Sequence, residues 1–225
     1  MADEEEELPP KPEKYTLTTE TDAVKPTSIA YTGEGTAAYT NGDTYKGIFA
    51  NGKRQGKGVY TYYSGDVFDG HFDDNKKTGL GRVTYKKGGY YHGYFKDGMR
   101  DGEGTFQYAN GDIYSGLWQA NKRHGTGTYI FTKTRYSYVG EWKDGQMAQG
   151  EWRMTDGTKF IGNFQDQKPA GEGRWHTSRG TVVQGAYLQQ VLPIDKAPPA
   201  PPEGDCVTTT KTYWKTTGLA AADEN

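Results

Sequence analysis

The feature that most constrains this chain is a five-residue motif that recurs at a nearly constant spacing. The motif opens with an aromatic residue, has glycine in third place and ends with an aromatic residue, as in Tyr45-Lys46-Gly47-Ile48-Phe49. Six copies lie between residues 45 and 164, and a weaker seventh covers residues 183–187. Their first residues are 23, 23, 23, 24, 22 and 23 positions apart. Such a period indicates a repeat architecture, in which each unit packs only on its neighbours.

Turn signals occur twice in each period. One set comprises Asn51-Gly52, Asp97-Gly98 and Asp144-Gly145, and the other comprises Asn41-Gly42, Ser64-Gly65, Asn110-Gly111 and Asp156-Gly157. Two turns in 23 residues leave room for two strands and for no helix of ordinary length. We therefore predict an all-β fold, an elongated single-layer twisted antiparallel meander of stacked β-hairpins over about residues 31–190.

Glycines keep phase with the aromatic residues. A glycine pair, such as Gly56/Gly58 or Gly79/Gly81, follows each of the six motifs except the fifth, which offers only Gly150. Because glycine lacks Cβ, it leaves bare backbone on which a neighbouring ring can lie, and alternation along a strand places the rings and glycines on one face. We expect the rings to stack from repeat to repeat. The predicted stacking aromatics are Tyr45, Phe49, Phe68, Phe72, Tyr91, Phe95, Tyr114, Trp118, Tyr138, Trp142, Phe160 and Phe164.

The two ends of the chain differ from this body. Residues 1–30 hold an acidic run and four prolines and are predicted to form a disordered or extended arm. Residues 191–225 begin with a proline-rich spacer, followed by Val207–Trp214, which has strand composition and is expected either to add to a partner's sheet edge or to stay a mobile tail. The net charge of -2 hides this division, because the ends are acidic and the body is mildly basic.

The residues offer little for catalysis or for cofactor binding. The single cysteine, Cys206, allows no intrachain disulfide, which favours a reducing compartment, and the four histidines occupy four different phases of the repeat. No Gly-x-Gly pair completes a dinucleotide-binding loop, and no nucleophile elbow is present. We expect neither an enzyme nor a bound cofactor or metal. The absence of a long apolar run and of a signal peptide predicts a soluble intracellular protein.

In the first four full repeats, basic residues recur at the turn eight and nine positions after the opening aromatic, and the row fades in the two repeats that follow. If the hairpins stack in register, they form one basic long edge, opposite an acidic edge with Asp43, Asp66 and Asp112. The basic edge is either a solubilising surface or a docking site for acidic protein surfaces; membrane lipid is a lesser alternative, and nucleic acid is not expected from so modest a charge. The predicted partner-binding residues of this edge are Lys53, Arg54, Lys76, Lys77, Arg100, Lys122 and Arg123.

Over about residues 31–187 the repeat resembles the MORN repeat, Tyr-x-Gly-x-Trp-x-x-Gly-x-x-x-Gly-x-Gly. A narrower likeness lies in residues 123–129, 138–146, 162–164, 169–171 and 184–187, together with the slip in spacing from 24 to 22. This combination is similar to the MORN proteins of the ciliary radial spoke head.

The resemblance implies a non-catalytic scaffold of the ciliary or flagellar axoneme. Such a subunit would bind other radial spoke head subunits, with a homodimer or a paired MORN sheet and a central-pair contact as further options. Its role would be to support mechanical signalling between the central pair and the dynein arms, and hence ciliary motility. The alternative is a membrane- or phosphoinositide-associated MORN tether.

Overall fold

A computed structural model describes residue 8, residues 10–191 and residues 210–221. All regular structure in these residues is β, which confirms the predicted fold class. The chain divides into two compact units, Met1–Lys122 and Arg123–Asn225, a division that the repeat period does not indicate. The strands of the first unit are β1 (Thr16–Thr19), β2 (Val24–Lys25), β3 (Gly33–Ala38), β4 (Thr44–Ala50), β5 (Lys53–Thr61), β6 (Val67–Asp73), β7 (Lys76–Thr84), β8 (Tyr90–Lys96), β9 (Met99–Gln107) and β10 (Ile113–Gln119).

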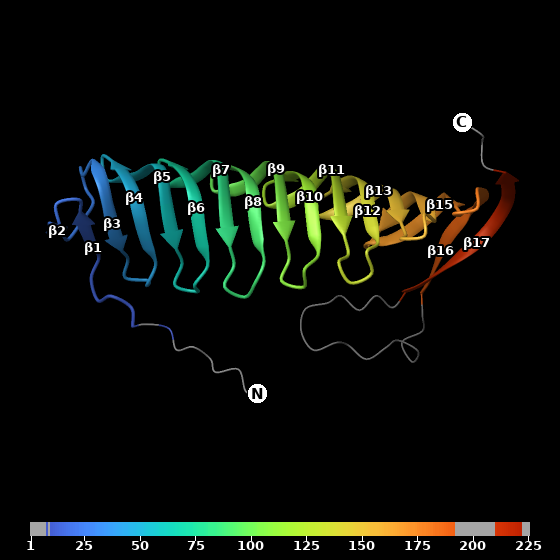
Figure 1. The fold of residues 1–225 in the computed structure, drawn as a ribbon, viewed down its shortest axis with the longest axis horizontal. Coiled ribbons are helices and arrows are strands. Elements are labelled where there is room, and N and C mark those ends of the chain that lie inside the picture. Colours follow the sequence, from blue (N-terminus) through green and yellow to red (C-terminus); the bar gives the residue numbers. More distant parts are fainter. Residues whose placement is uncertain (1–7, 9, 192–209, 222–225) are drawn as a thin grey trace. The chain divides into compact units, whose positions relative to one another are not determined.

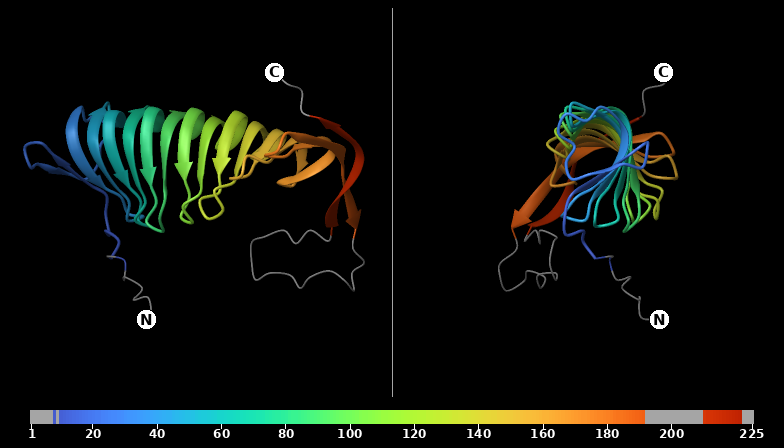
Figure 2. Two further views of the ribbon diagram at one scale, coloured as in Figure 1. Left: turned by 45° about the vertical axis from the view of Figure 1, so that its right-hand side comes forward. Right: turned by 90° about the vertical axis from the view of Figure 1, so that its left-hand side faces the viewer.

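Within the first unit, β3 to β10 form a meander in which each strand pairs antiparallel with the next (Figure 1). The strands are bent along their length, so this sheet is curved rather than flat (Figure 2).

The second unit repeats the same arrangement. Its strands are β11 (Lys122–Ile130), β12 (Ser137–Lys143), β13 (Gln146–Arg153), β14 (Lys159–Gln165), β15 (Lys168–His176), β16 (Thr181–Val191) and β17 (Thr210–Ala221). The last strand pairs along the whole of β16, from Thr181↔Ala221 to Val191↔Thr210. The strand expected near the C-terminus is therefore present from Thr210 to Ala221, and it pairs within its own chain. The predicted proline-rich spacer and Cys206 lie outside the described residues.

The two edges of the meander carry different turns. At one edge, which we call the tight-turn edge, two residues with positive φ join the strands, as at Asn51 (49°) and Gly52 (80°) or Asp74 (46°) and Asn75 (69°). Positive φ at both positions defines the type I′ turn, whose twist matches that of the flanking strands. At the other edge, the long-turn edge, five residues such as 39–43 join the strands, and Tyr39 N–H donates to the Asp43 carbonyl at 2.9 Å.

The two glycines of each pair have different roles. Gly56 has a φ of 64° and lies in a β-bulge, where the register between β4 and β5 shifts. Gly58 has extended backbone and pairs with Gly47. Both were expected to share the face of the rings, but the bulge changes the alternation at the first glycine.

The N-terminal region departs from the arm predicted for residues 1–30. β1 pairs with β3, from Thr16↔Ala38 to Thr19↔Gly35, and β2 pairs with β1. Leu17 of β1 is fully buried. This short hairpin has no counterpart in the 23-residue period, so the repeat pattern gave no signal for it.

Candidate interaction surface

In each unit, one side of the β-sheet carries the rings predicted to stack, and we call this side the aromatic face. All twelve are buried. Within one motif, the Tyr45 and Phe49 rings meet edge to face with their centroids 5.1 Å apart and an interplanar angle of 89°. Tyr45 also meets Phe72 of the next repeat at 5.1 Å and 82°. The same two contacts recur along the first unit, so edge-to-face pairs connect each repeat to the next.

A row of glycines supports these rings. In the first unit the paired residues include Gly47↔Gly58, Gly58↔Gly70 and Gly70↔Gly81. A Cβ placed on Gly58 would lie 2.5 Å from the Tyr45 ring, far inside van der Waals contact. The ring therefore occupies the space that a side chain would take. Burial also raises the pKa of Tyr45 to about 12, although the positive charge of Arg54 acts to lower it. The hydroxyl therefore stays protonated, and it donates a hydrogen bond to the Ile48 carbonyl at 3.0 Å.

Four of the seven residues predicted for the basic edge do not lie at the edge. The side chains of Arg54, Lys77 and Arg100 fold inward over the aromatic face and are half-buried. The Arg100 guanidinium lies 4.6 Å from the Trp118 ring centroid and donates to the Asn121 carbonyl at 3.0 Å. Arg54 makes the equivalent bond to the Asn75 carbonyl at 2.9 Å. All three cations cover the rings, and the two arginines also fasten neighbouring tight turns together.

In the second unit Arg123 has the same role. Its guanidinium lies 4.5 Å from the Trp142 ring centroid, and its Nε donates to the Gly145 carbonyl at 3.0 Å. Sequence spacing places all these residues next to a turn, but it does not reveal that a long side chain can reach back along its own strand.

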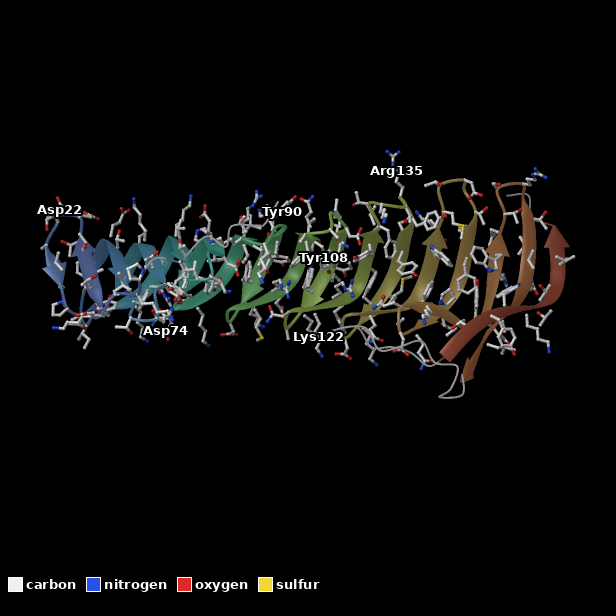
Figure 3. All side chains as sticks on the ribbon, turned by 90° about the horizontal axis from the view of Figure 1, so that it is seen from below. Asp22, Asp74, Tyr90, Tyr108, Lys122 and Arg135 are labelled. Carbon is white, nitrogen blue, oxygen red and sulfur yellow. The ribbon has the colours of Figure 1, made fainter. Side chains whose placement is uncertain are left out.

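The remaining lysines of the basic edge face solvent at the tight-turn edge. Lys53 forms an ion pair with Asp74, and Lys76 pairs with Asp97 at 2.9 Å. Lys122 is also exposed, and Figure 3 shows Lys122 and Asp74 at the same edge of the first unit. Solvent and salt screen such pairs, so they contribute little to stability. The accessible part of the predicted site is therefore a row of lysines that alternate with acids.

The opposite edge is not the acidic surface that the sequence predicts. Asp43 and Asp112 are only 9% and 8% exposed. The Asp43 carboxylate accepts hydrogen bonds from Tyr60 Oη at 2.6 Å, from the Tyr63 N–H at 2.8 Å and from Asn41 Nδ2 at 2.8 Å. It thereby joins its own long turn to the next one.

We expect this aspartate to contribute pH-dependent stability. Burial would raise the pKa of Asp43, but the hydrogen bonds from Tyr60, Tyr63 and Asn41 outweigh it and lower that pKa. Because the pKa of Asp43 is lower in the folded chain than in the unfolded chain, where it is about 3.9, the stabilisation is fully present at pH values above the unfolded-state pKa. It disappears as the pH falls through the folded-state pKa. Asp43→Ala should cost about 1–3 kcal/mol at pH 7 in urea unfolding, because donors lose their acceptor.

The difference between wild type and Asp43→Ala should shrink below about pH 4. The matched control is Asp69→Ala, at an exposed strand position, which should leave the unfolding free energy nearly unchanged. An equal cost at pH 7 and at pH 3 would contradict the assigned role.

We expect substitution of a cation that lies over the rings to lower stability, and substitution of a cation that faces solvent to have no effect. Arg100→Gln removes both the contact with Trp118 and the bond to the next turn, and we expect a loss of about 1–3 kcal/mol. Lys76→Gln removes only an exposed ion pair and should leave the melting temperature unchanged. Equal effects of the two substitutions in thermal melts would show that the inward placement has no energetic weight.

Among the described residues, no three His, Cys, Asp or Glu side chains are placed to hold a metal ion. The described part of the chain also has no helix that could span a membrane.

The sequence model of the MORN repeat matches residues 45–67, 68–90, 91–113, 114–133 and 138–159. No curated protein matches the chain. Among solved structures, the TCP domain of SAS-4 (dCPAP) of Drosophila melanogaster, solved in complex with a proline-rich motif of Ana2 (dSTIL), is 19% identical, with 67% of this chain and 81% of that chain covered and a TM-score of 0.42. The TCP10c domain of Drosophila melanogaster Sas-4 is 20% identical, with 67% and 90% covered and a TM-score of 0.39. Scores this low carry no information about function.

Proposed function

Since the chain belongs to the MORN-repeat family, whose repeats form non-catalytic interaction scaffolds, we propose that it is a structural subunit of the ciliary axoneme and part of the radial spoke head. The observation that carries the scaffold role is the repeat sheet itself. It presents the same side-chain pattern at each 23-residue step, so partners can engage a regular surface over several repeats.

The geometry favours proteins as the ligands. The exposed lysines of the tight-turn edge are interleaved with Asp74 and Asp97, so the edge has alternating charge rather than a dense positive field. Alternating charge selects a complementary protein surface and sets its register, whereas a polyphosphate or an anionic membrane is better served by a continuous basic cluster.

The spoke-head assignment rests on the likeness in residues 123–187. This stretch lies in the second unit, where the repeat is irregular: β11 and β12 are joined by residues 131–136. We infer that this region docks on other spoke-head subunits. Central-pair contact and pairing with a second MORN sheet belong to the same proposal.

Charge reversal of the exposed lysines tests the docking surface. Lys53→Glu, Lys76→Glu and Lys122→Glu together should leave the fold intact and weaken co-sedimentation with purified spoke-head subunits, with a loss that is largest at low salt and shrinks as salt is raised. Arg54 and Arg123 are left unchanged, because their reversal would damage the aromatic face. The matched control reverses Lys46 and Lys57, which are exposed on the other face.

Phosphoinositide liposomes separate the proposal from the membrane tether. Loss of liposome binding with unchanged co-sedimentation would favour the tether, and no change in either would leave the edge a solubilising surface. The assignment to the axoneme is tested by fractionation of demembranated cilia: the protein should stay with the axoneme and leave it with the radial spokes. Its release with the detergent-soluble membrane fraction would contradict the proposal.

A further inference from the structure

The aromatic face of the first unit contains a groove with cations in it. The groove has a volume of about 390 Å³, and Tyr62, Lys77, Tyr85, Phe95 and Arg100 contribute to its lining. It lies between two long turns that start at equivalent positions of successive repeats, Tyr62 and Tyr85. Ser64, Asp66, Val83 and Asn121 complete the lining.

Within the part of the chain that the structure describes, the two cations of this groove form no ion pair with a carboxylate. Lys77 Nζ donates to Tyr62 Oη at 3.2 Å and lies 5.5 Å from the centroids of both Phe68 and Phe95. The polar contacts of the Arg100 side chain are with Asn121. Among the described residues, neither cation has a carboxylate within ion-pair distance.

The one acid in the lining is already engaged elsewhere. Asp66 accepts a hydrogen bond from the Lys86 N–H at 2.9 Å. A half-buried positive charge among aromatic rings is poorly solvated, so an anionic ligand would be favoured there.

The chain's own N-terminal segment approaches this groove along the long turns. The Tyr15 ring lies 5.5 Å from that of Tyr39, and Lys11 Nζ lies 4.6 Å from the Tyr63 ring centroid. Tyr39 and Tyr62 occupy equivalent positions one repeat apart. The four residues from Tyr15 to Lys11 therefore advance by about one repeat, which is consistent with an extended chain: four residues reach ~13 Å, and two strands measure ~10 Å.

An extended chain continued in the same direction would bring the acidic run to the cations. Residues 3–7 read Asp-Glu-Glu-Glu-Glu, and they precede Lys11 by four to eight residues. An extended chain covers ~13–26 Å over that distance, or about one to two and a half repeats. One and two repeats beyond Tyr63 are the long turns of Tyr85 and Tyr108, so the groove with Lys77 and Arg100 is within reach.

We propose that the acidic run Asp3–Glu7 docks in this groove and pairs its carboxylates with Lys77 and Arg100. The segment then covers part of the aromatic face of its own chain, and a partner that uses this groove has to displace it. The inference goes beyond the scaffold role and does not depend on the axonemal assignment.

Peptide competition on the full-length chain tests the proposal. The probe is a fluorescent peptide of residues 2–10, whose binding is followed by fluorescence anisotropy. The test protein is a full-length variant, the neutral-arm chain, in which the five acids of the N-terminal run are replaced by their amides so that its own segment competes poorly for the groove. The neutral-arm substitutions are Asp3→Asn, Glu4→Gln, Glu5→Gln, Glu6→Gln and Glu7→Gln. A tethered segment has an effective concentration of about 1 mM. The peptide should therefore bind the neutral-arm chain at least about tenfold more tightly than the wild type, whose own segment competes.

A second substitution locates the binding. Lys77→Gln keeps a donor for Tyr62 and removes the charge, and in the neutral-arm chain it should weaken peptide binding about threefold or more. The matched control is Lys57→Gln, on the other face, which should leave it unchanged. A peptide in which all five acids are replaced by their amides should not bind.

Three outcomes would overturn the proposal. Equal affinity of the peptide for wild type and neutral-arm chain would mean that the acidic run does not occupy the groove, which then serves an acidic partner in trans. Absence of binding to the neutral-arm chain would mean that the groove does not take acidic segments. Binding that is insensitive to Lys77→Gln would place the docking site elsewhere.

Discussion

Replacing Gly81 with valine should destabilise the first unit by roughly 3–5 kcal/mol, the range expected for loss of a buried ring. A Cβ at this position would lie 2.6 Å from Cε2 of Phe68, whose ring is fully buried. The ring would have to leave its place on the glycine row, and its contacts with Phe72 and Phe95 would be lost with it. Urea unfolding followed by circular dichroism measures the change.

Gly218→Val provides the matched control. Gly218 also has extended backbone, but a Cβ there would have only the Gln184 side chain nearby, at 3.9 Å. Its substitution should leave stability nearly unchanged. If Gly81→Val unfolds at the same urea concentration as wild type, the rings do not rest on the glycines.

Replacing Trp118 with alanine should cost about 3 kcal/mol. The indole is buried, it meets Tyr91 and Tyr114 edge to face, and its Nε1–H donates to the Gly104 carbonyl at 3.1 Å. It also supports the guanidinium of Arg100. The loss therefore combines apolar burial, a hydrogen bond and a cation–π contact.

Trp118→Phe separates these contributions in the same unfolding assay. Phenylalanine stands at the equivalent position in the other three repeats of the first unit, as Phe49, Phe72 and Phe95, so the ring contacts should survive. We expect this variant to lose about 1 kcal/mol, the value of one hydrogen bond. A cost as large as that of alanine would show that the hydrogen bond, rather than the ring, is decisive.

The sequence was sufficient to predict the regular part of the fold. A period of 23 residues with two turns in each unit leaves only a β meander, and alternation along the strands places Tyr45 and Gly47 on one face. The structure has this arrangement, with the rings buried and the glycines paired across strands. Local propensity, spacing and packing all favour the same structure, which is why the prediction succeeds.

The details of the candidate site could not be obtained in this way. Arg54 and Lys53 are adjacent in sequence, yet one lies over the rings and the other faces solvent, because β residues alternate between faces. Asp43 was assigned to a charged edge, although its carboxylate is enclosed by the donors of the next turn. The β1 hairpin escaped detection because a single short pairing leaves no periodic trace.

The limited range of the ring contacts has a consequence for how the chain folds. Tyr45 contacts Phe72 and Phe68 contacts Phe95, so each contact joins residues that are 27 positions apart and lie in neighbouring repeats. Contacts between residues close in sequence have a low loop-closure cost. Because the repeats are similar, a folding nucleus can form at several equivalent positions. We therefore expect folding to begin at any of the regular hairpins of the first unit and to spread from it in both directions, so that a mutation in one repeat should slow only the propagation through that repeat.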